Sequence, residues 1–276
     1  MPQRGLRKGE HLVESRKLLP VTVSMACWLD LLGYGAMLNR ASFDPYHPIA
    51  KRAIERLRAF QEVVANNSLA AFPTLVINDG AVAYADVGID ARDKVSAFVE
   101  RSWKLFEAAS ATDIAGGGGG IRAVVAAGLR AKGSRRGFMK QDADYAAIIR
   151  SLASAAIDER AALAAMRKVR RVHDIVPQLQ ANFAFSRAYT AEASGKKGGI
   201  GGARFFLDRS VLAGEAPAWM TVSDPIPWEP GAQIASLATS FHAVEAMDPL
   251  PEGAERAFRT GRELYERLRH DMTGTA

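Results

Sequence analysis

Hydrophobic and polar residues alternate along positions 21–29, and this period of two predicts a β-strand. The strand runs into a glycine-containing turn, Leu32-Gly33-Tyr34-Gly35. Two short apolar runs flank Asn78-Asp79-Gly80, and Asp-Gly between such runs is a strong signal for a β-hairpin. Further strands are predicted over residues 121–128, 203–208 and 219–222.

Apolar residues that recur every three or four positions predict amphipathic helices elsewhere in the chain. These helices are expected over residues 49–64, 93–109, 141–171, 180–193 and 253–270. The predicted strands and helices do not alternate regularly, and no G-x-G-x-x-G turn is present, which argues against a dinucleotide-binding fold. We therefore expect an α/β fold, an α+β sandwich in which helices flank a mixed or antiparallel sheet.

The composition narrows the classes of site that the chain can hold. It has 276 residues, one cysteine and five histidines. A disulfide framework and a multi-cysteine zinc site are excluded, and a histidine-rich metal cluster is not expected. No apolar run reaches the roughly 20 residues of a membrane span, and residues 1–17 lack the apolar stretch of a secretory signal. We expect a cytoplasmic protein that does not contact a membrane.

The formal net charge is +6, and the basic residues are spread along the chain. An excess of this size suits an anionic ligand. Nucleic acid is not the expected partner, and binding to it through charge alone is kept as an alternative.

Two aspartates stand out by their places in the predicted elements, since Asp30 ends the first strand and Asp79 lies in the hairpin turn. If the strand pairs with the hairpin, their carboxylates meet at one edge of the sheet. Two close carboxylates repel each other unless a cation lies between them, and Mg²⁺ and Mn²⁺ prefer carboxylate oxygens together with substrate phosphates. The alternative is that Asp30 caps the next helix and Asp79 only shapes the turn.

Three segments resemble the class III nucleotidyl cyclases in their order and spacing. They are VTVSMACWLDLLGYGA at residues 21–36, LVINDGAVAYADV at residues 75–87 and GIRAVVAAG at residues 120–128. In that family they correspond to the opening strand, the second metal-binding hairpin and the core strand that follows.

The resemblance implies a homodimer with active sites at the subunit interface. Asp30 and Asp79 match the family's two metal-binding, catalytic aspartates, and the backbone carbonyl of Leu31 matches a further metal ligand. Two Mn²⁺ or Mg²⁺ ions would activate the ribose 3′-hydroxyl of a nucleoside triphosphate, which attacks the α-phosphate and expels pyrophosphate. Gly33 and Tyr34, in the turn after the strand, would bind the triphosphate through the backbone.

A later helix departs from the family pattern, in which an Asn is followed four residues on by an Arg that stabilises the transition state. Asn182 and Arg187 are five residues apart, so they do not share a helix face as the motif requires. Aligning the apolar residues instead puts Phe185 and Tyr189 at these positions, and Tyr189 is then expected to bind substrate. Arg122, also expected to bind substrate, or Arg187 could replace the missing arginine, with a structural salt bridge as the alternative for each.

The divergent second half is similar to the stand-alone pyrimidine cyclases of bacterial anti-phage defence, the Pycsar systems. This similarity implies UTP as substrate and cyclic UMP as a messenger for a separate cyclic-nucleotide-sensing effector. The alternatives are an adenylate or guanylate cyclase, and a degenerate cyclase-like domain that binds nucleotide without turnover. The expected organisation is an N-terminal arm over residues 1–19, a cyclase-like domain over 20–215, and a C-terminal strand and helix extension over 216–276 packed on the same domain.

Overall fold

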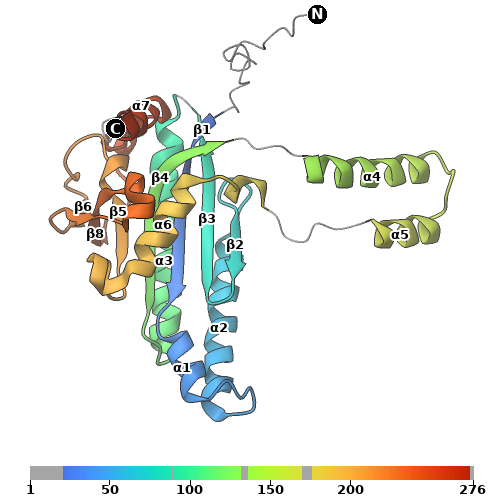
Figure 1. The fold of residues 1–276 in the computed structure, drawn as a ribbon, viewed down its shortest axis with the longest axis horizontal. Coiled ribbons are helices and arrows are strands. Elements are labelled where there is room, and N and C mark those ends of the chain that lie inside the picture. Colours follow the sequence, from blue (N-terminus) through green and yellow to red (C-terminus); the bar gives the residue numbers. More distant parts are fainter. Residues whose placement is uncertain (1–20, 89, 132–135, 170–175, 274–276) are drawn as a thin grey trace, which may run out of the picture.

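The computed structural model describes residues 21–88, 90–131, 136–169 and 176–273 (Figure 1). The arm expected over residues 1–19 lies outside the described residues. The strands are β1 (Val21–Leu31), β2 (Thr74–Ile77), β3 (Gly80–Val87), β4 (Ile121–Ala131), β5 (Phe205–Asp208), β6 (Met220–Val222), β7 (Ile226–Trp228) and β8 (Thr239–Met247). The helices are α1 (Tyr34–Arg40), α2 (Pro48–Asn67), α3 (Arg92–Ala115), α4 (Arg136–Ala153), α5 (Glu159–Lys168), α6 (Phe183–Ser194) and α7 (Gly261–Thr273).

One mixed sheet organises the described part of the chain. The strand order is β2-β3-β1-β4-β5-β8-β6, with β7 paired to β8. Strands β4 and β5 are parallel, and the other strand pairs of this sheet are antiparallel. The expected α/β fold with a mixed sheet flanked by helices is therefore confirmed.

Strand β1 lies in the interior of the sheet and is buried on both faces. Its odd-numbered residues, such as Met25 and Leu29, belong to a core cluster with side chains of α2, α3 and α7. Its even-numbered residues Ala26 and Trp28 belong to a second cluster, with Ala188 of α6. The alternation seen in the sequence thus separates two faces that are both covered by helices, rather than a core from solvent. Helix α6 covers the face with Ala26 and Trp28, whereas α2, α3 and α7 lie on the other face (Figure 1).

Gly128 explains how closely α6 approaches the sheet. The sequence predicts that the strand ends at this glycine, whereas β4 continues to Ala131. A Cβ at position 128 would collide with backbone atoms of Phe183 and Ala184. The glycine therefore leaves room for the first turn of α6 rather than ending the strand.

Strands β7 and β8 are not predicted by the sequence pattern. The four consecutive residues from Phe241 to Val244 are all buried in β8, so this strand shows no alternation of apolar and polar positions. His242 is packed in this strand, with its Nδ1 2.9 Å from the Ser223 carbonyl oxygen. Because β6 and β8 belong to the same sheet as β1, residues on both sides of position 215 share one sheet, and the boundary at 215 stays a prediction.

Two predicted helices are wrong in extent. The helix expected over residues 141–171 is two helices, α4 and α5, which lie side by side and project from the sheet (Figure 1). A left-handed backbone at Ala155 (φ 56°) and the capping side chain of Asp158 separate them. The helix expected over 253–270 begins only at Gly261, because Phe258 is extended, fully buried and bridged to Leu212. None of the described helices is long and apolar enough to cross a bilayer.

Candidate active site

The end of β1 brings Asp30 next to the turn that carries Asp79. In the sheet register, Asp30 lies opposite Gly80 on β3 and opposite Arg122 on β4. One residue further on, the backbone N–H of Leu31 donates a hydrogen bond of 3.0 Å to the carbonyl oxygen of Asp79. The strand therefore pairs with the hairpin, which was the condition for the two aspartates to meet, and both lie at the same end of the sheet.

The turn between β2 and β3 has a backbone that fixes where Asp79 lies. Asn78 is in the left-handed region (φ 55°), which Asn tolerates better than most residues, and its Nδ2 donates to Oδ1 of Asp79 at 2.8 Å. A Cβ at Gly80 would overlap the indole ring of Trp28. The Asn-Asp-Gly sequence thus serves both the turn and the close packing of β3 on β1.

The turn after β1 is held by an ion pair that the sequence analysis missed. Arg56 of α2 donates to the Leu32 carbonyl at 3.1 Å and to the Asp113 carboxylate of α3 at 2.8 Å. The same carboxylate accepts the N–H of Gly120 at 2.8 Å, and the carbonyl of Gly120 in turn accepts the N–H of Leu32 at 3.1 Å. Arg56 falls on the charged side of the helical pattern, so only its long-range partners distinguish it from a solvated arginine.

Gly33, with a φ of 80°, starts the helix that follows. Helix α1 begins at Tyr34 without a side-chain cap, and Tyr34 is buried. Burial and the nearby Asp79 carboxylate raise the pKa of the Tyr34 hydroxyl above its ordinary value. The expected triphosphate contacts of Gly33 and Tyr34 stay predictions.

Asp30 is in an unfavourable environment for a carboxylate. Burial, the negative charge of Glu192 on α6 and the negative charge of Asp79 raise its pKa to about 7, against the opposing effect of Arg122. Glu192 is a third carboxylate at this site, and the sequence analysis missed it because nothing in the pattern of α6 marks it. Asp30 would be stabilised in its charged form by an additional cation.

Arg122, expected to contact substrate, is held by Glu192. Its Nε donates to Glu192 Oε1 at 2.7 Å, its Nη2 bonds the same oxygen, and its Nη1 donates to the Ile200 carbonyl at 3.2 Å. Both side chains of the pair are largely buried. These contacts favour the alternative of a structural salt bridge, and a substrate contact of Arg122 stays a prediction.

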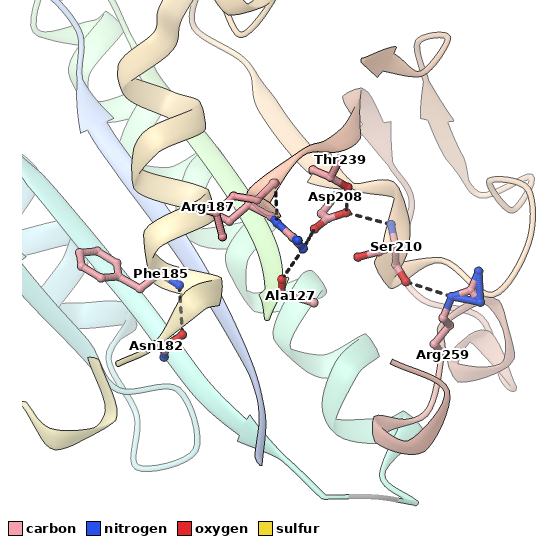
Figure 2. Close-up of polar contacts among 9 residues, drawn as sticks. Ala127, Asn182, Phe185, Arg187, Asp208, Ser210, Thr239 and Arg259 are labelled. Carbon is pink, nitrogen blue, oxygen red and sulfur yellow. Dashed lines mark hydrogen bonds and ion pairs between the residues drawn. The ribbon is translucent and has the colours of Figure 1, made fainter. Parts of the chain in front are cut away.

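Asn182 occupies a structural position at the start of α6. Its side-chain oxygen accepts the N–H of Phe185 at 3.1 Å, which caps the helix (Figure 2). Its Nδ2 donates to Ser24 Oγ at 2.9 Å and to the Gln178 carbonyl at 2.8 Å. The side chain is buried, and every polar atom of its amide has a partner within the chain.

Arg187 points from α6 into the protein (Figure 2). Its Nη1 donates to the Ala127 carbonyl at 2.8 Å and to the Asp208 carboxylate at 3.2 Å, and its Nε donates to the Leu237 carbonyl at 3.0 Å. Asp208 is fully buried. Arg187 is therefore part of a buried ion pair, as in the structural alternative for this residue.

Phe185 and Tyr189 lie on another side of α6, against Trp28. Their ring centroids are 5.9 Å and 5.2 Å from the centroid of the Trp28 indole, and Tyr189 is 49% exposed. Trp28 stands two residues before Asp30, on the same side of β1. Tyr189 is thus near the aspartates, and its expected substrate contact stays a prediction.

The oxygen atoms at this site suit a hard divalent cation in type, but they are too few to complete its coordination shell. Asp30, Asp79 and the carbonyl of Leu31 offer only oxygen ligands, which Mg²⁺ and Mn²⁺ prefer. Among the described residues, no group of three or more His, Cys, Asp or Glu side chains is arranged to hold a metal. The three oxygen donors would therefore need phosphate oxygens or water to complete a coordination shell.

No family model matches this chain, and no curated protein matches it. Several solved structures of cyclases are similar in fold. The crystal structure of the guanylyl cyclase Cya2 is 11% identical with a TM-score of 0.49, and the match covers 85% of this chain and 96% of that chain. The adenylyl cyclase CyaB from P. aeruginosa is 8% identical with a TM-score of 0.44, and the match covers 83% of this chain and 96% of that chain. The guanylate cyclase domain of RhGC from Catenaria anguillulae, in complex with GTP, is 8% identical with a TM-score of 0.39, and the match covers 83% of this chain and 100% of that chain.

Proposed function

We propose that this protein is a metal-dependent nucleotidyl cyclase, with Asp30 and Asp79 as the catalytic carboxylates. The proposal is carried by one observation: the Leu31–Asp79 hydrogen bond and the pairing of Asp30 with Gly80 put both aspartates at one end of the sheet. The pKa of Asp30, raised to about 7, supports a site that is completed by a cation. The resemblance of residues 21–36 and 75–87 to class III cyclases gives this cation site its proposed chemistry.

Each part of the site has a proposed task. Asp30, Asp79 and the Leu31 carbonyl would hold two Mg²⁺ or Mn²⁺ ions, and these ions would supply the positive charge that activates a hydroxyl nucleophile and offsets the charge of a triphosphate. The backbone N–H groups of the turn at Gly33 and Tyr34 face the triphosphate. In this turn, the neighbouring Leu32 carbonyl is fixed by Arg56, so the turn is pre-organised before substrate arrives.

The reaction forms one bond and breaks one. The 3′-oxygen attacks the α-phosphorus, the bond from that phosphorus to the bridging oxygen breaks, and pyrophosphate leaves with the negative charge. The hydroxyl proton passes to solvent. Little covalent work falls to the chain, whose residues position the substrate and offset charge.

Among the described residues, the two arginines expected near the site are both engaged within the subunit, Arg187 of α6 by Asp208 and Arg122 of β4 by Glu192. We therefore propose that a second copy completes the site, in a homodimer that uses the α6 side of the sheet. Exposed apolar side chains support this surface: Tyr189 on α6 and Ile77 at the hairpin are 49% and 44% exposed, and Phe183 at the start of α6 is 48% exposed. An interface that covers these side chains would bury apolar area now in contact with water.

For the base and the biological role, we propose UTP as substrate and cyclic UMP as product, in anti-phage signalling to a separate effector. This finer assignment rests only on the resemblance to the pyrimidine cyclases. An adenylate or guanylate cyclase fits the same carboxylates. A nucleotide-binding domain without turnover is the second candidate, and the internal partners of Asn182 and Arg187 favour it.

The deciding experiment incubates the full chain with each of the four nucleoside triphosphates and Mn²⁺, and identifies products by mass. We expect a 3′,5′-cyclic nucleotide and pyrophosphate from UTP. Asp30→Ala and Asp79→Ala should abolish product, whereas Asp224→Ala, an exposed aspartate outside the site, should not. Circular dichroism controls for folding. Activity retained in either site variant contradicts the assignment, and nucleotide binding without product selects the second candidate.

A further inference from the structure

A cavity of about 660 Å³ lies between the 3₁₀ turn at Arg209–Val211, the start of β8 and helix α7. Its size is within the range of small-molecule pockets. None of its lining residues belongs to the site around Asp30. We call it the arginine-lined cavity, after Arg209, Arg259 and Arg267, which line it together with His270, Ser210 and Glu215.

The arginine-lined cavity lies away from the aspartates in the sheet. Strands β4 and β5 are parallel, and β1 is antiparallel to β4. Asp30 at the carboxyl end of β1 is therefore level with the start of β4. The cavity begins past Asp208, at the carboxyl end of β5, in the opposite direction along the sheet.

Charge is the first feature that defines a ligand for this cavity. Arg209 and Arg259 bring two guanidinium groups to a lining that holds one carboxylate, that of Glu215. Arg209 and Arg259 are 50 positions apart in the chain, so the positive charge is gathered by the fold rather than by a basic run. Guanidinium groups bind phosphate oxygens through paired hydrogen bonds.

Ser210 is the second and independent feature. Its Oγ is buried and has no hydrogen-bond partner among the described residues. Both backbone groups of Ser210 are held, since its N–H donates to Asp208 at 2.9 Å and its carbonyl accepts from Arg259 Nε at 3.0 Å (Figure 2). A buried hydroxyl without a partner costs free energy, so a rotation of this side chain toward a ligand oxygen in the cavity that it lines would relieve that cost.

The side chains that line the cavity also indicate that the ligand has no nucleobase. The lining contains no Phe, Tyr or Trp side chain, so no aromatic ring is available to stack on a nucleobase. We propose that the arginine-lined cavity binds a small diphosphate without a nucleobase, through Arg209, Arg259 and the Ser210 hydroxyl. This site does not depend on the proposed cyclase activity.

The test is calorimetric titration of the full chain with inorganic pyrophosphate in buffer containing EDTA, where a divalent-ion site at Asp30 and Asp79 contributes nothing. We expect saturable binding by the wild type. Arg209→Gln and Ser210→Ala should each weaken it, Arg209→Gln by about tenfold. Arg160→Gln, an exposed arginine on α5, changes the net charge equally and should bind like the wild type. Melting temperatures establish that the variants fold.

Three results would overturn the proposal. The first is the absence of binding at millimolar pyrophosphate. The second is equal weakening by Arg209→Gln and Arg160→Gln, which indicates only a general effect of charge. The third is binding of UDP more than about tenfold tighter than pyrophosphate, which would require contacts to the base or sugar that this lining does not offer. None of these results bears on the aspartates, so the two proposals can fail separately.

Discussion

The backbone N–H of Leu31 donates a hydrogen bond of 3.0 Å to the carbonyl oxygen of Asp79. This bond joins the last residue of β1 to the hairpin turn, 48 positions later in the chain. It fixes the backbone of the hairpin turn beside the end of β1, so that the side chains of Asp30 and Asp79 both start from the same end of the sheet.

Gly80→Ala should disturb this relationship. The added Cβ would meet the Trp28 ring, so the hairpin must move away from β1 or the indole must shift. We expect a loss of about 1–3 kcal/mol in the free energy of unfolding, measured by urea denaturation, and weaker stabilisation of the variant by Mn²⁺. Gly231→Ala is the control, since a Cβ there meets nothing within 4 Å. Equal stability of the two variants would contradict the packing described for Gly80.

Asp30 should make stability depend on pH in metal-free buffer. Its pKa is about 7 in the folded protein and 3.8 ordinarily, so between these values the folded state holds more protons than the unfolded state. The free energy of unfolding should therefore fall as pH rises from about 4 to about 7. Asp30→Asn cannot ionise, so its stability relative to wild type should increase over this range.

Melting temperatures of wild type and Asp30→Asn, measured in EDTA at several pH values, test this expectation. Adding Mg²⁺ at pH 8 should then raise the melting temperature of the wild type more than that of the variant. A constant difference between the two proteins at every pH would show that Asp30 titrates normally.

Arg187 should matter for stability more than for catalysis. Arg187→Met leaves the fully buried Asp208 without its charged partner. Breaking a buried pair from one side costs about 3–5 kcal/mol. The double variant Arg187→Met with Asp208→Asn should recover part of this loss, because Ser210 N–H and Thr239 Oγ1 still bond the side chain at position 208. Urea denaturation of the wild type and the two variants measures the effect, and a double variant no more stable than Arg187→Met contradicts it.

Tyr189→Glu should separate the proposed dimer. The substitution puts a charge on the exposed part of the α6 surface, next to Phe185 and Trp28. We expect the wild type to be dimeric by light scattering and the variant to be monomeric and less active, with unchanged circular dichroism. Tyr46→Glu, at a residue 82% exposed outside α6, should remain dimeric. A monomeric wild type with full activity would exclude the need for a second copy.

Local sequence signals predict the elements that carry the aspartates. The alternation of residues 21–29 and the Asn-Asp-Gly turn correspond to β1 and to the β2–β3 hairpin. These signals are local, because strand period and turn chemistry depend on a few neighbouring residues. These local signals do not determine that β1 pairs with β3 and so brings Asp30 beside Gly80. The sequence allowed that pairing only as an assumption.

The contacts that the sequence pattern misses are long-range. Arg56 and Asp113 form their ion pair across 57 positions, and Glu192 reaches Arg122 across 70. The sequence pattern does not predict strand β8 for another reason, since a strand buried on both faces has no alternation of apolar and polar residues. Sequence periodicity carries no information on which distant elements meet, so the ion pairs around the site emerge only in the fold.

The most direct test of the central claim is ³¹P NMR of the wild type with UTP and Mg²⁺, compared with Asp79→Asn. The account predicts that wild-type protein converts the triphosphate into equal amounts of a cyclic phosphodiester and pyrophosphate, and that Asp79→Asn does not. Release of orthophosphate with UDP, or a spectrum that stays unchanged with all four nucleoside triphosphates, would contradict it.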